Sequence, residues 1–226
     1  MTLLPWLLLA FSLGLLAFPF PAFYSRRHSY RALAELDIER RNASWWTTWR
    51  RVLRFPWHWA EIFRGAAGSW MAVRMLDALA PDWPEYVATA DWARSVIPLL
   101  AVHVSTVLSA LLFRSPGKQP APIFFTSAAT LTLLVPAIAV PSLLLAGAVM
   151  LAFKSLSAFF LVLGPSLLAL GLVFEREPWI GVTGLVVAIA PLLIAVGRNR
   201  DIVLPVHRSK ARAGSGERSG DSEHKL

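Results

Sequence analysis

Long uncharged apolar runs, separated by short polar segments, dominate the pattern of the chain. The first run covers residues 3–20 and is followed by the basic segment "YSRRHSYR"; further runs cover residues 96–113, 121–174 and 179–196. About 20 apolar residues are needed to cross a hydrocarbon layer roughly 30 Å thick. The pattern therefore predicts membrane-spanning helices. Since no charge precedes the first run, it is typical of an uncleaved anchor and not of a secretory signal peptide.

The run 121–174 is too long for one crossing, because a helix of this length would measure roughly 80 Å. It must reverse once, either within Pro136–Pro141 or within Phe153–Ser155. Lys154 is the only charged residue of the run. A reversal at Phe153–Ser155 leaves Lys154 at a membrane surface and avoids the cost of about 2.5–3.5 kcal/mol for a charge at the bilayer centre. We therefore expect five spans with this reversal.

Charge sorting orients the five spans. If the N-terminus lies outside, most lysines and arginines fall in cytoplasmic segments, as the positive-inside rule requires. The predicted organisation is an anchor (1–22), a cytoplasmic interfacial segment (23–93), a four-helix transmembrane bundle (94–197) and a disordered basic cytoplasmic tail (198–226). We expect an all-α polytopic protein of the inner membrane with its C-terminus in the cytoplasm. A six-span alternative, in which residues 57–80 also cross, ranks lower because it would bury Glu61 and Arg64.

Composition supports the membrane interpretation. Hydrophobic residues make up 56% of the 226 residues and charged residues only 16%, too few for the surface of a soluble domain of this length. The chain has no cysteine, which excludes disulfides and zinc–thiolate sites. The net charge of +8 then indicates anionic lipid headgroups as a partner, and we expect no nucleic acid.

Residues 43–59, "ASWWTTWRRVLRFPWHW", combine tryptophan with arginine. At helical spacing the rings and the arginines fall on opposite faces, and Pro56 ends one helix and suits the start of the next. This pattern predicts two amphipathic helices lying on the cytoplasmic leaflet, with Glu61 and Arg64 on the polar face of the second. The alternative is that these helices pack on the protein's own spans or on another subunit. The candidate lipid- or partner-binding residues are Trp45, Trp46, Trp49, Arg50, Arg51, Arg54, Trp57, Trp59, Arg64 and Trp70.

Polar residues inside the apolar runs are candidates for an intramembrane site. These are His103, Ser105, Thr106, Ser127, Thr130 and Lys154. His103 is a possible ligand of haem or chlorophyll, but a bundle haem usually needs a second axial ligand. We therefore expect no cofactor and no metal. The ordinary alternatives are a neutral histidine in a polar seam and a lysine that extends to the membrane surface.

Small residues recur every seven positions in the fourth span, at Ser157, Gly164 and Gly171, and predict close helix packing. No catalytic constellation accompanies them; His58 and Glu61, three residues apart, are the one pair suited to acid–base chemistry on a lipid. We therefore expect a non-catalytic membrane subunit or scaffold that binds lipid and partner subunits or itself. A small channel or transporter with kinked, hydroxyl-lined helices is the first alternative, and a lipid-modifying enzyme is the second.

Overall fold

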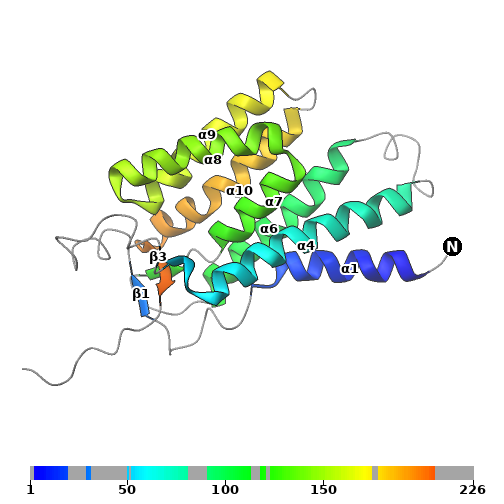
Figure 1. Cartoon of the computed structure of the whole chain (residues 1–226), viewed down its shortest axis with the longest axis horizontal. Helices are drawn as coiled ribbons and strands as arrows, with labels where there is room; N and C mark the ends of the chain where they lie inside the picture. Colours follow the sequence, from blue (N-terminus) through cyan, green and yellow to red (C-terminus); the bar gives the residue numbers. More distant parts are fainter. Residues whose placement is uncertain are drawn as a thin grey trace, which may run out of the picture.

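The computed structural model describes residues 3–19, 29–31, 50, 52–80, 91–112, 118–120, 123–174 and 178–206. These residues are predominantly helical (Figure 1). The helices are α1 (Leu3–Ala17), α4 (Pro56–Leu79), α6 (Asp91–Leu112), α7 (Ile123–Leu134), α8 (Pro136–Phe153), α9 (Leu156–Phe174) and α10 (Pro178–Gly197). The strands are β1 (Ser29–Arg31), β2 (Lys118–Pro120) and β3 (Asp201–Val206). The chain is an all-α polytopic membrane protein, as its sequence predicts.

Four helices are long and apolar enough to cross a membrane, namely residues 93–112, 136–153, 156–174 and 178–197. Two further apolar helices, 3–17 and 124–134, are shorter. Their apolar side chains face both the bundle interior and its outside: Leu163 is buried, for example, whereas Leu161 is exposed. This two-sided hydrophobicity is typical of a helix with protein on one side and lipid on the other.

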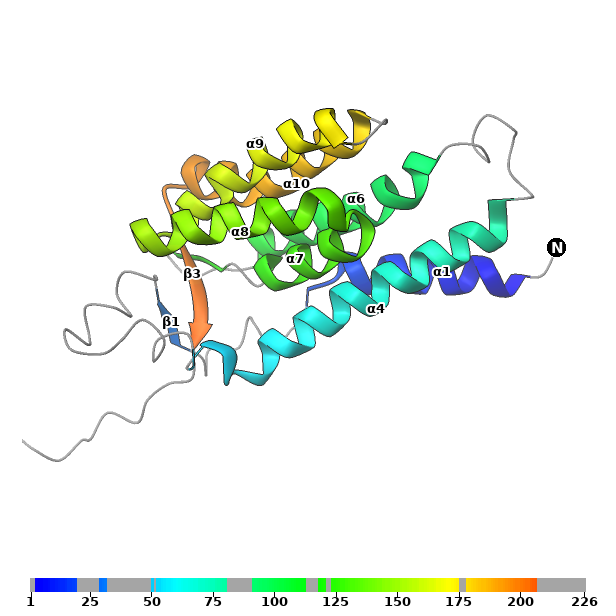
Figure 2. The ribbon, with the colours of Figure 1, turned by 45° about the horizontal axis from the view of Figure 1, so that its top comes forward.

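The helices run to and fro between two ends of one bundle (Figures 1 and 2). We call the end beside the strands the strand end, and the opposite end, where α1 begins, the far end. The two-residue turn at Lys154–Ser155 makes α8 and α9 an antiparallel pair, and α10 packs on α9. On the other side α4 packs between α1 and α7, and α6 contacts both groups.

A small sheet lies at the strand end (Figure 2). Its strand order is β1-β3-β2, with β1 antiparallel and β2 parallel to β3. Tyr30 pairs with Pro205, and Gln119 pairs with Ile202. The sheet thus joins segments that follow α1, α6 and α10 in the sequence and brings the ends of these helices together.

The structure corrects the predicted position of residues 57–80. Helix α4, of 24 residues, packs against α1 and α7, as the alternative prediction had it, and keeps one face exposed. The face predicted to be solvated, with Glu61 and Arg64, points into the bundle, while Trp59, Phe63 and Trp70 are exposed. We expected a solvated face because Glu61 and Arg64 were treated as two separate charges. In the structure the two side chains form an ion pair inside the protein.

The run 121–174 reverses at two places and not at one. The chain turns at Lys154, the predicted position, and Lys154 adopts the left-handed conformation that ends α8 (φ 52°). It also turns back at Val135 (φ −139°, ψ 61°), immediately before Pro136, which separates the 12-residue α7 from α8. Proline at the first helical position suits the start of α8, because its fixed φ is helical. An N–H at this position would have no hydrogen-bond partner within the helix, so its absence costs nothing. The two predicted reversal positions are therefore both used.

Candidate functional site: a buried ion pair between four helices

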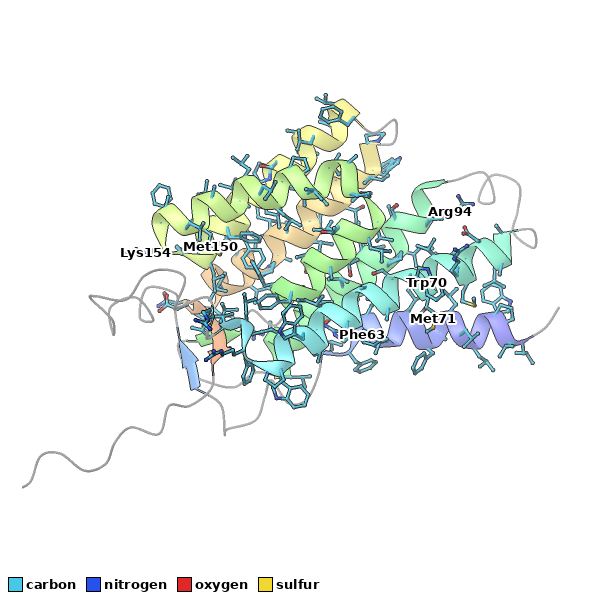
Figure 3. The ribbon with its side chains drawn as sticks, viewed as in Figure 1. Phe63, Trp70, Met71, Arg94, Met150 and Lys154 are labelled. Carbon is cyan, nitrogen blue, oxygen red and sulfur yellow. The ribbon has the colours of Figure 1, made fainter. Side chains whose placement is uncertain are left out.

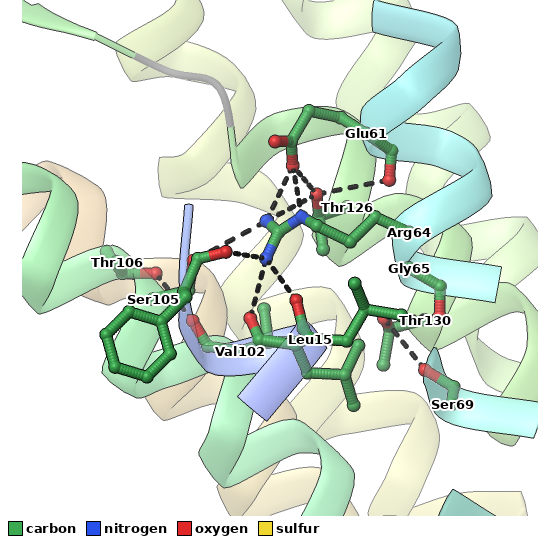
Figure 4. Close-up of polar contacts among 12 residues, drawn as sticks. Leu15, Glu61, Arg64, Gly65, Ser69, Val102, Ser105, Thr106, Thr126 and Thr130 are labelled. Atoms are coloured by element: carbon green, nitrogen blue, oxygen red, sulfur yellow. Dashed lines mark hydrogen bonds and ion pairs between the residues drawn. The ribbon is translucent and has the colours of Figure 1, made fainter. Parts of the chain in front are cut away.

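Glu61 and Arg64 form an ion pair inside the bundle (Figure 4). Their spacing of three residues places both side chains on the same face of α4. The Nη2 atom of Arg64 lies 2.6 Å and its Nε atom 3.0 Å from Oε2 of Glu61. Only 1% of the Arg64 side chain and none of the Glu61 side chain is accessible. The pair therefore lies in a low-dielectric environment, where separating the two charges is costly.

The same guanidinium closes the C-terminus of α1. Nη1 of Arg64 donates hydrogen bonds to the carbonyl oxygens of Leu15, Leu16 and Phe18, at 2.9, 2.8 and 3.0 Å. The last carbonyls of a helix have no partner within the helix and carry the negative end of its dipole. A cation at this position satisfies them and interacts favourably with the dipole. Arg64 thus bonds the end of α1 to the middle of α4.

Hydroxyl groups from two further helices complete the site. Nη2 of Arg64 donates to Oγ1 of Thr126 on α7 at 3.0 Å and reaches Oγ of Ser105 on α6 at 3.5 Å. Oγ1 of Thr126 also contacts the carboxylate of Glu61 and lies 3.2 Å from the backbone carbonyl oxygen of Glu61. Four helices, α1, α4, α6 and α7, therefore meet at one guanidinium group.

A second polar contact continues the site along α4 and α7. Oγ of Ser69 donates to Oγ1 of Thr130 at 3.0 Å, and Thr130 lies 3.4 Å from the carbonyl oxygen of Gly65. Both hydroxyl side chains are buried. We call Glu61, Arg64, Ser69, Ser105, Thr126 and Thr130 the polar seam.

Gly65 makes this close approach possible. A Cβ atom at Gly65 would lie 2.6 Å from the carbonyl oxygen of Thr126 and 3.1 Å from Cβ of Ala129. Because the nearest atom belongs to the backbone of α7, a side chain at this position requires the two helices to separate. The absence of a side chain here lets α4 and α7 come close enough for the seam to form.

The seam is chemically closed in this conformation. All three guanidinium nitrogens of Arg64 donate to groups of the chain itself. Arginine has donors only, and its guanidinium engages the carboxylate of Glu61. Among the described residues, no group of three or more His, Asp or Glu is placed to hold a metal ion. The arrangement is therefore suited to joining helices, and a solute would reach Arg64 only if the helices moved.

The other predicted intramembrane residues do not gather in one place. Thr106 is buried but donates to the carbonyl oxygen of Val102 within its own helix, at 3.2 Å. Ser127 is buried on α7, and His103 is half-buried on α6. Lys154 is exposed at the strand end, away from the seam (Figure 3). Of the predicted set, only Ser105 and Thr130 belong to the seam.

The predicted lipid- and partner-binding residues differ in their exposure in the structure. Trp59 and Trp70 are exposed, Trp57 is half-buried, and Arg50 and Arg54 are exposed before α4. Arg64 is buried, so its predicted contact with lipid phosphates is replaced by the contacts of the seam. The remaining candidates, Trp45, Trp46, Trp49 and Arg51, lie outside the described residues.

His58 and Glu61 do not form a surface acid–base pair. Both side chains are buried, and the His58 ring lies 4.4 Å from the ring of Phe125 and 5.2 Å from that of Phe55. This burial leaves neither side chain open to a lipid headgroup in this conformation. The proposed acid–base role on a lipid loses its geometric basis.

The small-residue positions of α9 face α10. A Cβ atom at Gly171 would lie 2.7 Å from Cα of Gly181, and one at Gly164 would lie 3.0 Å from Cδ1 of Leu185. Ser157 is half-buried near the start of the helix. The two glycines are therefore occupied by contacts within the chain and offer no free surface to another subunit.

Sequence reasoning missed the seam as a unit, although signals for it exist. Glu61 and Arg64 at helical spacing, beside Gly65 and Gly68, indicate a charged pair on a face that other helices approach. The chain matches no protein-family model, and neither the curated proteins nor the solved structures contain a match to it. Function must therefore be argued from the residues of the chain itself.

Proposed function

We propose that the chain is a non-catalytic integral membrane subunit or scaffold that binds lipid and another membrane subunit. The observation that supports this proposal is the seam, in which Arg64 bonds groups of α1, α4, α6 and α7. The polar groups of the seam bond to one another and hold the four helices in one arrangement. A fixed bundle with an apolar outside suits assembly with other membrane helices, where packing and not water exclusion drives association.

The surface that we propose for this assembly is the exposed aromatic stripe of α4. Trp59, Phe63 and Trp70 lie on one side of the helix, with exposed fractions of 56%, 73% and 56% (Figure 3). Large aromatic side chains dominate the energetics of many protein interfaces. We propose a transmembrane helix of another subunit as the occupant of this stripe.

We also propose an orientation in the inner membrane with the strand end in the cytoplasm. The lysines and arginines are concentrated in the segments that connect or follow helices at this end. These segments contain 18 of the 22, and they are 20–55, 113–122, Lys154 and 198–226. The far-end segments 81–90 and 175–177 contain four acidic residues and one arginine. Under the positive-inside rule this asymmetry supports an orientation with the N-terminus outside and the C-terminus in the cytoplasm. In this arrangement α4 and α7 also pass between the two ends.

Site-specific photo-crosslinking in native membranes tests the assembly proposal. A photoreactive phenylalanine analogue is introduced at Phe63, and a matched control is introduced at Leu144 of α8, which is 70% exposed. We expect a discrete protein adduct from position 63 and only lipid adducts from position 144. Lipid adducts alone from both positions would remove the support for a partner on α4.

A small channel or transporter is the second candidate, and one observation favours it. The seam carries charged and hydroxyl groups into a bundle that lies in lipid, and it borders α7, a short helix that ends at the break at Val135. Broken helices and intramembrane charges are typical of transport pathways. Solute flux into liposomes that is abolished by Ser127→Phe or Thr130→Phe, in protein that still folds, supports this candidate. The absence of flux across a broad solute panel counts against it.

A further inference from the structure

A groove follows the contact between α4 and α7 on the outside of the bundle. Its first part, nearest the far end, is a cavity of about 470 Å³ lined by Trp70, Arg74, Asp77, Arg94, Ser95 and Leu133, among others. Its second part has a volume of about 500 Å³ and is lined by Ile62, Ala66, Ala128, Ala129 and Leu133, among others. Because Leu133 lines both parts, they adjoin each other. The groove is therefore polar at one end and apolar along the rest.

Among the described residues that line it, the polar part carries one unit of net positive charge. Oδ1 of Asp77 lies 2.7 Å from Nε of Arg94, so these two charges form a pair. Arg74 is exposed, and its guanidinium carbon lies 5.8 Å from the centre of the Trp70 ring. Ser95 contributes a hydroxyl group from the first turns of α6, where the helix dipole also favours an anion. A singly charged anionic group matches this end of the groove.

The apolar part is shaped by small side chains. Ala66 on α4 and Ala128 and Ala129 on α7 line it together, and their small side chains leave a channel between the helices in which no described residue is charged. Ile62, Ala66, Trp70 and Arg74 follow each other at intervals of four residues, so they form one stripe along α4. The stripe is about 18 Å long at 1.5 Å per residue, close to the roughly 15 Å that one leaflet contributes to the hydrocarbon core.

We propose that this groove binds a single anionic phospholipid from the leaflet at the far end of the bundle. Its phosphate lies against Arg74 and Ser95, and one acyl chain lies over Ala66, Ala128 and Ala129. An amphiphile satisfies both parts at once: a free phosphate leaves the apolar part empty, and a hydrocarbon leaves Arg74 without an anion. This site is separate from the basic strand end. It adjoins the surface proposed for the partner of α4, because Trp70 belongs to both, but it does not require that partner.

Titration of a fluorescent phosphatidylglycerol into the purified full-length protein in mild detergent tests the proposal. We expect saturable binding that unlabelled phosphatidylglycerol displaces. Phosphatidylcholine, which has the same acyl chains and no net charge, should displace it at least about tenfold less effectively, and inorganic phosphate should not displace it. Equal displacement by phosphatidylcholine, or displacement by phosphate alone, would overturn the proposal.

Two variants address the two ends of the groove separately. Arg74→Gln removes the charge and should weaken binding about tenfold, whereas Arg198→Gln, at an exposed arginine directly after α10, should leave it unchanged. Ala66→Leu fills the apolar part and should weaken binding by a similar factor with Arg74 intact. Thermal unfolding of each variant without lipid verifies folding. Unchanged affinity in a folded Arg74→Gln or Ala66→Leu variant contradicts the proposal, and so does a protein adduct in place of a lipid adduct from a photoreactive residue at Ala66.

Discussion

Nη1 of Arg64 lies 2.8 Å from the carbonyl oxygen of Leu16, so a side chain of α4 closes the end of a helix 48 positions earlier in the sequence. The same side chain is paired with Glu61. One arginine therefore has two structural roles, to neutralise a buried carboxylate and to satisfy the terminal carbonyls of α1. Loss of the arginine leaves both sets of groups without this partner, so we expect the bundle to be sensitive to substitution at this position.

We expect Arg64→Met to lower the free energy of unfolding by about 3–5 kcal/mol, because it leaves the charge of Glu61 buried and unpaired. The double variant Glu61→Leu/Arg64→Met should be more stable than this single variant, since no buried charge remains. It should not regain the full stability, because the α1 carbonyls still lack a donor. Unfolding in detergent, measured as a double-mutant cycle, tests this. Additive effects of the two substitutions would contradict the coupling.

Gly65→Ala tests the close approach of α4 and α7. The added Cβ would lie 2.6 Å from a backbone carbonyl oxygen, which cannot move without moving its helix. We expect the free energy of unfolding to fall by about 1–3 kcal/mol, the usual cost of overpacking. Gly147→Ala on α8 is the matched control, because nothing lies within 4 Å of its Cβ position. It should be neutral or stabilising by up to about 1 kcal/mol through helix propensity. Equal effects of the two substitutions would exclude a steric role for Gly65.

The backbone at Lys154 provides a third test. Lys154 has φ 52°, in the left-handed region, and ends α8. This conformation costs a residue with a Cβ atom about 1–2 kcal/mol relative to glycine. Lys154→Gly and Lys154→Val remove the same charge, so the difference between them reports the backbone. We expect the glycine variant to be more stable than the valine variant by at least about 1 kcal/mol in thermal or denaturant unfolding. Equal stability would place the reversal elsewhere.

Hydropathy alone was sufficient to predict α6, α9 and α10, because each is an apolar run of nearly one membrane thickness. It was not sufficient for α7, whose 12 residues continue into α8 without any polar residue between them. The break depends on the backbone at Val135 and on Pro136, and proline also occurs inside the continuous helices α6, α8, α9 and α10. A proline in the sequence therefore did not distinguish a reversal from a continuing helix.

The polar seam could not be predicted from the sequence for a different reason. Whether a membrane helix buries an ionisable side chain depends on the partners that the fold supplies. Arg64 finds them at Leu16 and Thr126, 48 and 62 positions away in the sequence. Local periodicity places Glu61 and Arg64 correctly on one face of α4, but it cannot say whether that face meets water or other helices. We predicted that this face meets water. In the structure it is buried against other helices, so the predicted rotation of α4 about its axis was wrong.

The position of α4 gives the last prediction, a topology experiment that separates the two interpretations of this helix. The chain has no cysteine, so single cysteines introduced at Arg54, Ala80 and Asn199 can be labelled specifically. Arg54 precedes α4 at the strand end, Ala80 follows it at the far end, and Asn199 follows α10. With a membrane-impermeant maleimide on intact cells, we expect labelling of Ala80→Cys only. Arg54→Cys and Asn199→Cys should react after the membrane is permeabilised, because the orientation that we propose puts the basic strand end in the cytoplasm. Labelling of Arg54→Cys and Ala80→Cys from the same side would mean that α4 does not pass between the two membrane surfaces, and the orientation of the seam in the bilayer would then have to be revised.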